Sequence, residues 1–194
     1  FGRPEGITAN LMTAQLARFY GVSFSGHGGL TTAKLPSPEV GYQKALTAVP
    51  ILLIGGNFWM DAGLLSADEV YSPIQMVLDN EFLGALQHLC KDFEISDESL
   101  ALETILAVGP GGNYVDQPHT ARYFRREQWQ PQLWTRSMLG PWLEAGSKLD
   151  VDLARERVLD LARAGLPEPQ ISSAFEDGLL AVIEKARRAL VGKE

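Results

Sequence analysis

Strand-like segments are confined to the first half of this sequence, and this asymmetry limits the folds that the chain can adopt. Residues 22–25 and 57–60 are expected to form short strands, and they alternate with helices expected at 7–20, 38–54 and 70–92. Strands that alternate with longer helices predict βαβ units and a parallel sheet. Strand-like runs are nearly absent after residue 92. The sequence therefore predicts an α/β part to about residue 92, followed by an all-helical part.

Helix boundaries are marked by residues that start or stop helices. Gly21 is expected to end the first helix, and Ser37 with Pro38 to begin the second. The apolar residues of the second helix share one face: Tyr42, Ala45, Leu46 and Val49. The helices expected in the second half are 97–108, 118–128, 150–164 (with Gly165 and Pro167 as its stop) and 175–190.

The predicted sheet is too small to stand alone. Two or three strands are too few for a closed barrel or a full doubly wound sheet, so partner strands from elsewhere are expected. The sequence also begins with Phe1 and an amphipathic helix that leads towards a strand. We therefore expect the 194 residues to be a piece of a longer protein.

Composition excludes several classes of protein. The formal net charge is −7 and the basic residues are scattered, which argues against a nucleic-acid partner. The single cysteine, Cys90, cannot form an internal disulfide and fits a reducing compartment. No apolar run is long enough to cross a membrane, and no signal-peptide pattern opens the sequence. The expected location is the cytoplasm.

Neither the glycine-rich motifs nor the metal-binding residue types predict a cofactor site. The motifs "GHGG" at 26–29 and "GPGGN" at 109–113 lack the spacing of phosphate-binding loops, and "GPGG" is explained by a helix that ends in a turn. The three histidines, His27, His88 and His119, lie in separate elements, and His88 and Cys90 point away from each other on one helix. No metal site is predicted.

Aromatic residues cluster at the ends of the predicted strands. Tyr20 and Phe24 lie at the first strand, and Phe58 and Trp59 at the second, where Asn57 and Asp61 bracket them. Aromatic rings beside a carboxylate can hold a quaternary ammonium group by cation–π attraction and charge pairing. The alternative is that these rings only fill the core.

His119 is the other candidate for function. Pro118 is expected at the first position of a helix, which puts His119 in the first turn, where the helix dipole disfavours a charged imidazolium. A neutral imidazole could hydrogen-bond to a ligand. The alternative is a histidine that caps or packs beside the exposed Arg122 and Arg126.

Four stretches together resemble the trimethylamine:corrinoid methyltransferase superfamily, from about residue 5 to residue 190. They are "AQLARFYGVSFSGHGGLTTAKLPSPEVGYQKALTAVP", "IGGNFWMDAGLL", "QMVLDNEFLGALQHL" and "ESLALETILAVGPGGNYVDQPHTARYFRREQWQPQLW". The resemblance implies an α/β fold, namely the C-terminal part of a (β/α)8 TIM barrel followed by a helical tail. Residues 1–92 would be the last segment of the barrel and residues 93–194 the helical C-terminal region of the same domain.

The resemblance also implies an activity. Family members transfer a methyl group from a quaternary or tertiary amine to the Co(I) atom of a corrinoid that a separate small protein carries. Such a protein binds no cofactor directly, and its partners are the cognate corrinoid protein and the amine. The founding enzyme has pyrrolysine at a position that we place near Leu30, where this sequence has only standard residues. It therefore resembles the non-pyrrolysine branch, whose members demethylate quaternary amines such as glycine betaine.

The motifs of the family suggest site residues at the C-terminal ends of the barrel strands, where such barrels have their active sites. The expected catalytic residues are His119, in the histidine-threonine motif, and Asp61. The expected substrate contacts are Phe24, His27, Asn57, Phe58 and Trp59.

Two other interpretations remain open. The chain could be a non-catalytic module that binds a quaternary amine, or an incomplete barrel without activity alone. An open barrel exposes sheet edges and apolar helix faces, so homo-oligomers are also expected unless the helical tail covers them.

Overall fold

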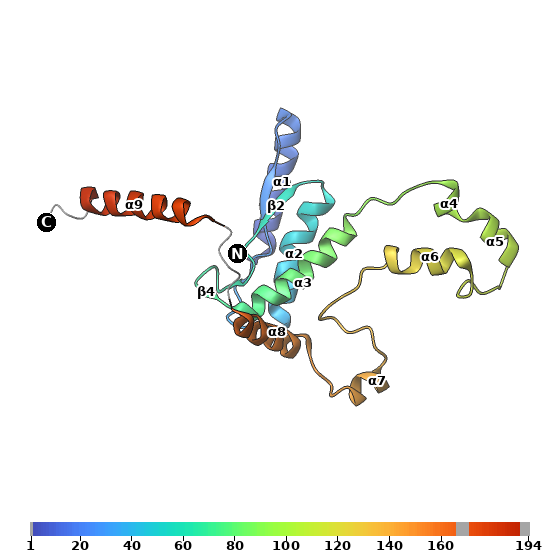
Figure 1. Cartoon of the computed structure of the whole chain (residues 1–194). Coiled ribbons are helices and arrows are strands. Elements are labelled where there is room, and N and C mark those ends of the chain that lie inside the picture. The colour runs from blue at the N-terminus through green and yellow to red at the C-terminus, as the bar shows by residue number, and fades with distance from the viewer. Residues whose placement is uncertain (1, 166–170, 191–194) are drawn as a thin grey trace. The chain divides into compact units, whose positions relative to one another are not determined.

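The computed structural model describes residues 2–165 and 171–190, and the chain divides into two compact units, Phe1–Leu159 and Asp160–Glu194. The first unit contains the strands and most of the helices (Figure 1). The proline stop expected at residue 167 lies outside the described residues.

A parallel βαβ unit forms the centre of the first unit, as the sequence predicts. Strand β1 (Ser25–Gly28) pairs in parallel with β2 (Asn57–Met60), and helix α2 (Pro38–Leu53) connects them and contacts both. Helix α1 (Pro4–Tyr20) packs against α2 and β1. Gly21 ends α1 in the left-handed conformation, with φ 66°, which a glycine adopts without strain. The central unit therefore has two helices beside a two-stranded parallel sheet (Figure 1).

The first strand lies three residues later than the sequence predicts. The expectation of a strand at 22–25 is wrong, because β1 runs through the segment that was expected to be a glycine-rich turn. A Cβ built on Gly26 would lie 3.0 Å from both the Phe24 ring and the Ile51 side chain. The glycine is thus needed where strand and helix approach closely.

A short antiparallel hairpin follows β2, which the sequence did not predict. Strands β3 (Leu64–Leu65) and β4 (Val70–Tyr71) pair with each other, and helix α3 (Pro73–Leu89) begins after them rather than at residue 70. The side chain of Ser72 caps α3 by accepting a hydrogen bond from the backbone N–H of Gln75 at 3.2 Å. The hairpin thus takes up the start of the segment that was expected to be helical.

The loops after the strands pack on α2. Ala33 from the loop after β1, Leu65 from β3 and Val40 from α2 form one buried apolar cluster. The backbone N–H of Ser66 donates to Ala33 O at 2.8 Å, and that of Ala67 donates to Thr31 O at 3.0 Å. These contacts join the two loops to each other over α2.

The face that α2 buries differs from the apolar face expected for it. Tyr42 and Leu46 are exposed, whereas the buried residues of α2 are Val40, Lys44, Thr47, Ala48 and Ile51. The buried face of α2 thus combines apolar residues with two polar side chains, Lys44 and Thr47, that have hydrogen-bond partners outside the helix.

The second half begins with three helices, α4 (Asp97–Leu100), α5 (Leu102–Val108) and α6 (Pro118–Glu127). The helix expected at 97–108 is interrupted at Ala101, whose φ is 51°. Gly109 ends α5, and Pro118 is the first residue of α6, as the sequence predicts. "GPGG" is therefore the end of a helix followed by a turn.

A buried carboxylate on α3 anchors the segment after α6. Glu81 Oε1 accepts hydrogen bonds from the backbone N–H groups of Gln132, Leu133 and Trp134, at 2.8, 2.9 and 3.3 Å. The Trp129 and Trp134 rings meet edge to face, with centroids 5.1 Å apart. Residues on both sides of position 92 thus belong to one compact unit, and the division of roles expected there stays a prediction.

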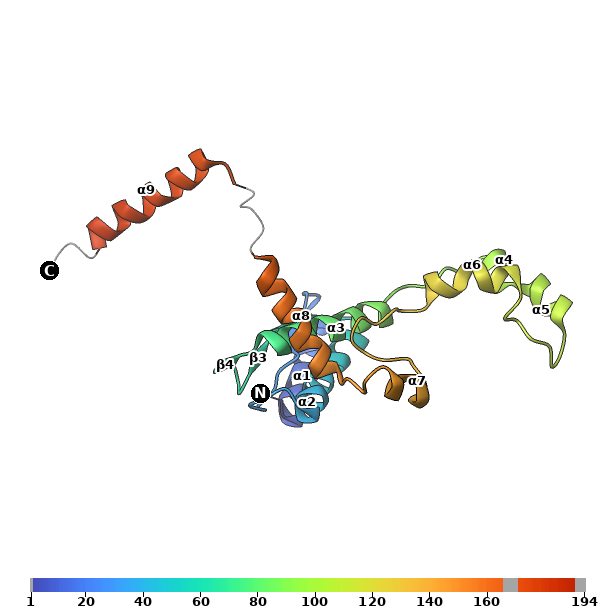
Figure 2. The same ribbon diagram turned by 60° about the horizontal axis from the view of Figure 1, so that its bottom comes forward.

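The remaining helices are α7 (Leu139–Glu144), α8 (Asp150–Ala164) and α9 (Ser173–Leu190), of which the sequence predicts the last two (Figure 2). The apolar stripe of α9 includes Phe175, Leu179 and Ile183, each about half exposed. In the described part of the chain, no helix combines the length and the apolar character that crossing a membrane requires.

Candidate functional site

The open face of the β1–β2 sheet brings several of the predicted site residues together. The register pairs His27 with Trp59 and Ser25 with Asn57. Registered neighbours on parallel strands project to the same face, and the residues of β1 alternate between exposed and buried. His27 and Trp59 therefore share the exposed face, and Trp59 is 68% exposed.

Asp61 follows β2 at the same end of the sheet. Its Oδ2 lies 3.7 Å from His27 Nδ1, which is longer than a hydrogen bond but close enough for ion pairing when the imidazole is protonated. The Asp61 side chain is 32% exposed and that of His27 59% exposed. A carboxylate, an imidazole and an indole thus meet at the C-terminal ends of two parallel strands.

The loop that follows β1 is held by two polar residues of α2. Gln43 Oε1 accepts hydrogen bonds from the Thr31 hydroxyl at 2.8 Å and from the Thr32 backbone N–H at 2.7 Å. The Thr47 hydroxyl accepts from the Leu30 backbone N–H at 3.0 Å. These bonds fix the loop next to His27 and leave the sheet face beside it accessible.

The other residues predicted to contact the substrate are Phe24, Asn57 and Phe58, and each has different surroundings from the His27–Asp61 pair. Phe24 is half-buried, and its ring lies against Gly26 and Gly56 beside Ile51, which is fully buried. This is a packing position on the α2 side of the sheet. Asn57 is exposed at the start of β2, and Phe58 pairs in register with Gly26. The Phe58 side chain is outside the described residues, and the substrate contacts predicted for these residues stay predictions.

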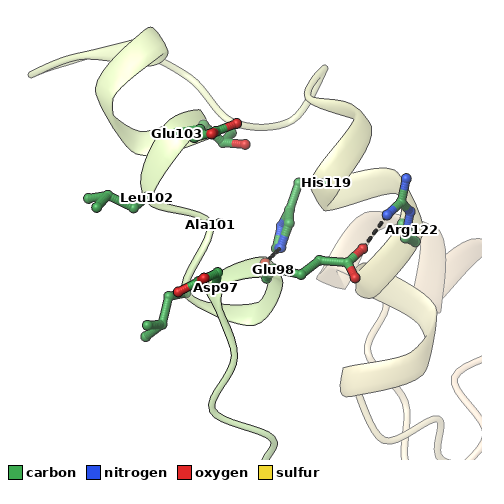
Figure 3. A pocket seen from close by; sticks show the side chains of 9 residues that line it. Asp97, Glu98, Ala101, Leu102, Glu103, His119 and Arg122 are labelled. Carbon is green, nitrogen blue, oxygen red and sulfur yellow. Dashed lines mark hydrogen bonds and ion pairs between the residues drawn. The ribbon is translucent and has the colours of Figure 1, made fainter.

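His119 belongs to a separate cluster between α4 and α6. Its Nε2–H donates to the backbone carbonyl of Glu98 at 2.8 Å, and its ring stacks on Tyr123 with centroids 4.4 Å apart. Figure 3 shows His119 pointing towards Glu98 and Arg122 paired with the Glu98 carboxylate. Glu98, His119 and Arg122 contribute to the lining of an open pocket of about 540 Å³.

The charges of this cluster stabilise one another. The hydrogen bond from Arg122 is the main cause that holds the pKa of Glu98 below its ordinary value. The hydrogen bond from Arg126 does the same for the pKa of Glu127, with Lys91 contributing. Loss of hydration raises the pKa of Tyr123, and the Glu98 charge adds to that effect. His119 thus contacts the Glu98 carbonyl and the Tyr123 ring, and the substrate contact expected of it stays a prediction.

Sequence reasoning missed the polar residues that support the site. Lys44 and Asp79 form a buried ion pair between α2 and α3, and Glu81 holds the segment 132–134. One signal could have found the burial of the pair: Lys44 shares a helical face with Val40 and Ala48, and Asp79 shares one with apolar residues at helical spacing, namely Met76, Phe82 and Leu83. A buried charge requires a partner, so such a position predicts that a partner exists but not which residue it is.

The exposed site has the chemistry of a cation receptor. An indole face and a carboxylate both attract a positively charged group. Among the described residues, no group of three or more His, Cys, Asp and Glu side chains is arranged to hold a metal ion.

Comparison with known proteins identifies the family. A family model described as trimethylamine methyltransferase matches residues 1–191. The chain belongs to the trimethylamine methyltransferase family. The resemblance expected from the four sequence stretches is thereby confirmed.

The trimethylamine methyltransferase family includes relatives with two named substrates. The chain is 31% identical over 191 residues to a trimethylamine methyltransferase of Methanosarcina barkeri, covering 98% of this chain and 38% of that protein. It is 35% identical over 194 residues to a glycine betaine methyltransferase of Desulfitobacterium hafniense, covering 100% of this chain and 40% of that protein. The chain thus spans about two fifths of the length of these relatives.

Proposed function

We propose that this chain is the C-terminal part of a methyltransferase that moves a methyl group from a quaternary or tertiary amine to the corrinoid of a partner protein. Membership of the trimethylamine methyltransferase family supports methyl transfer from methylated amines. The observation that carries the proposal to particular residues is the meeting of Trp59, Asp61 and His27 on one open sheet face.

Substrate binding follows from charge and shape. A quaternary ammonium group is a bulky cation, which the Trp59 face attracts by cation–π interaction and the Asp61 carboxylate by its charge. With the ammonium held between them, one N-methyl group can point away from the sheet. His27, within ion-pair distance of Asp61, can contact a carboxylate on the substrate.

The transfer makes few chemical demands on these residues. When bound, the partner's corrinoid supplies a Co(I) nucleophile that accepts the methyl group. The broken C–N bond leaves its electron pair on nitrogen, so a quaternary amine departs as a neutral tertiary amine and needs no proton. The chain's own residues therefore bind and orient the cation, and orientation of the reacting groups makes a large contribution to rate.

We further propose that the βαβ unit belongs to a (β/α)8 barrel. The parallel pairing of β1 and β2 around α2 is the repeat from which such barrels are built. His27, Trp59 and Asp61 lie at the C-terminal ends of these strands, where active sites of barrels form. The remaining strands would come from outside the 194 residues.

The test uses the protein that carries this sequence, mixed with a cognate corrinoid protein in the Co(I) state and with individual amines. We expect the absorbance spectrum of the corrinoid to change on methylation with glycine betaine or another quaternary amine. Calorimetry with the same amines tests the alternative that the chain is a module that binds the amine without demethylating it. Binding without demethylation, or no methylation with any amine, would contradict the proposal.

A further inference from the structure

A buried ion pair joins the two helices that lie on either side of the hairpin. Lys44 on α2 and Asp79 on α3 meet with Nζ and Oδ2 2.6 Å apart, and each side chain is only 2% exposed. Removing two charges from water costs several kcal/mol per ion, and well-packed apolar residues often stabilise a fold as well as such a pair does. Stability alone therefore does not explain the pair.

The same two side chains also bind the backbone of the loop that carries Asp61. Asp79 Oδ2 accepts a hydrogen bond from the Gly63 N–H at 2.7 Å, and Lys44 Nζ donates to the Asp61 carbonyl at 3.4 Å. Gln75 Nε2 donates to the other carboxylate oxygen of Asp79 at 2.7 Å, which fixes the orientation of the carboxylate. The loop is thus held on both sides of Ala62.

We propose that Lys44 and Asp79 are positioning residues that set the place of the Asp61 carboxylate and thereby the binding of the substrate cation. The inference rests on the proposed function. Neither residue touches the substrate, and both act through the backbone at Asp61 and Gly63.

The geometry of Asp61 makes this support necessary. Its side chain is partly exposed, and its contact with His27, at 3.7 Å, is too long to orient it firmly. The turn itself is restrictive, because Gly63 has φ 81° and a Cβ there would lie 2.7 Å from the Tyr71 ring. The place of the carboxylate therefore depends on the backbone bonds that Lys44 and Asp79 make.

Helix α2 supports both sides of the site from adjacent positions. Lys44 holds the loop after β2, while Gln43 and Thr47 hold the loop after β1. A change at Lys44 should therefore move Asp61 and leave the β1 loop in place.

Two variants of the protein that carries this sequence test the inference. Lys44→Met/Asp79→Leu removes both charges and keeps apolar volume between the helices, but it leaves the Gly63 N–H and the Gln75 amide without their acceptor, so its melting temperature should fall while the protein still folds. Asp79→Asn keeps the side-chain volume but replaces the carboxylate that accepts from both Lys44 and the Gly63 N–H by a weaker amide acceptor, so it loosens the same loop and serves as the test if the double variant does not fold. A misplacement of about 1 Å can cost a site about a hundredfold. We expect KM and the calorimetric Kd for the amine to rise by about tenfold or more.

The kinetic split separates positioning from mere stability. A purely structural role would lower the active fraction and hence kcat, with KM and Kd unchanged. The matched control is Lys148→Met/Glu156→Gln, which removes an exposed pair with an N–O distance of 2.7 Å and should leave KM unchanged. If the unchanged protein methylates the corrinoid partner and both variants keep its KM, the positioning role is refuted. If the unchanged protein transfers no methyl group, the proposed function fails first.

Discussion

At the scale of single residues, the candidate site depends on two side chains with different kinds of attraction for a cation. The Trp59 indole offers a polarised face, and the Asp61 carboxylate offers a charge. Both are accessible at the strand ends, so their substitution removes attraction without opening the core. They are therefore suitable for direct tests of substrate binding.

We predict that Trp59→Leu weakens amine binding more than it weakens folding. A cation–π contact contributes about 0.5–2 kcal/mol, which corresponds to a rise in Kd of about 2- to 30-fold. Calorimetry with glycine betaine measures the change. Trp59→Phe, which keeps an aromatic face, should retain more of the affinity than Trp59→Leu. Equal affinities for the two variants would argue against an aromatic contact with the cation.

Glu81 illustrates how one residue fixes a segment distant in sequence. Its buried carboxylate accepts three backbone hydrogen bonds from residues 132–134. Hydrogen bonds to a charged group contribute about 1.5–3 kcal/mol each when a single one is removed, although the values do not add.

We predict that Glu81→Ala lowers the free energy of unfolding by about 2–4 kcal/mol, because it leaves buried N–H groups without an acceptor. Chemical denaturation of the protein followed by tryptophan fluorescence measures this loss, since Trp129 and Trp134 lie in the anchored region. Glu103→Ala, at an exposed glutamate, is the control and should change stability by less than about 0.5 kcal/mol. A similar loss in both variants would contradict the anchoring role.

At the scale of elements, α4 and α6 are held together by charges rather than by a buried core. Neither helix has a buried residue. Between the helices, Arg122 pairs with the Glu98 carboxylate and His119 Nε2–H donates to the Glu98 carbonyl. Within α6, the Tyr123 ring stacks on His119 and lies 4.4 Å from the Arg126 guanidinium. The ion pair between Arg122 and Glu98 depends on pH, because it requires a charged carboxylate.

We predict that the contact between α4 and α6 weakens in acid. The pKa of Glu98 is lowered in the folded protein, so its stabilising effect is complete above the unfolded pKa, near 4.3, and disappears as pH falls through the lowered folded pKa. The difference in melting temperature between the unchanged protein and Glu98→Gln measures the effect. This difference should be present at neutral pH and vanish in strong acid, and it should be small because the residues are exposed. A difference in melting temperature that grows in acid would contradict the prediction.

At the scale of the whole molecule, the sheet is open. In residues 2–165 and 171–190, β1 and β2 pair only with each other, and many large apolar residues are exposed, including Phe93 at 80% and Val115 at 79%. Open edges and exposed apolar surface favour association.

We therefore predict that the 194-residue chain, when it is produced alone, self-associates. Light scattering at increasing protein concentration should give a mass that rises above 21.2 kDa. A monomeric mass at every concentration would contradict this prediction and indicate that the chain covers its own edges.

The sequence by itself determined where most helices begin and end. Gly21, Pro38, Gly109 and Pro118 mark boundaries that the structure confirms, because caps and stops act on backbone groups within one turn. The parallel βαβ unit also follows from the alternation of strands and helices. The exact start of β1 did not, because Gly26 is explained by the close approach of Ile51 on α2 and not by a turn.

Only the tertiary structure decided which residues support the candidate site. Lys44 and Asp79 are separated by 35 residues, and Glu81 and Leu133 by 52, so no local pattern pairs them. The contact of His27 with Asp61 likewise depends on the register of two strands that a whole helix connects. Propensity and capping act locally along the chain, whereas a buried charge is stable only where the fold brings its partner.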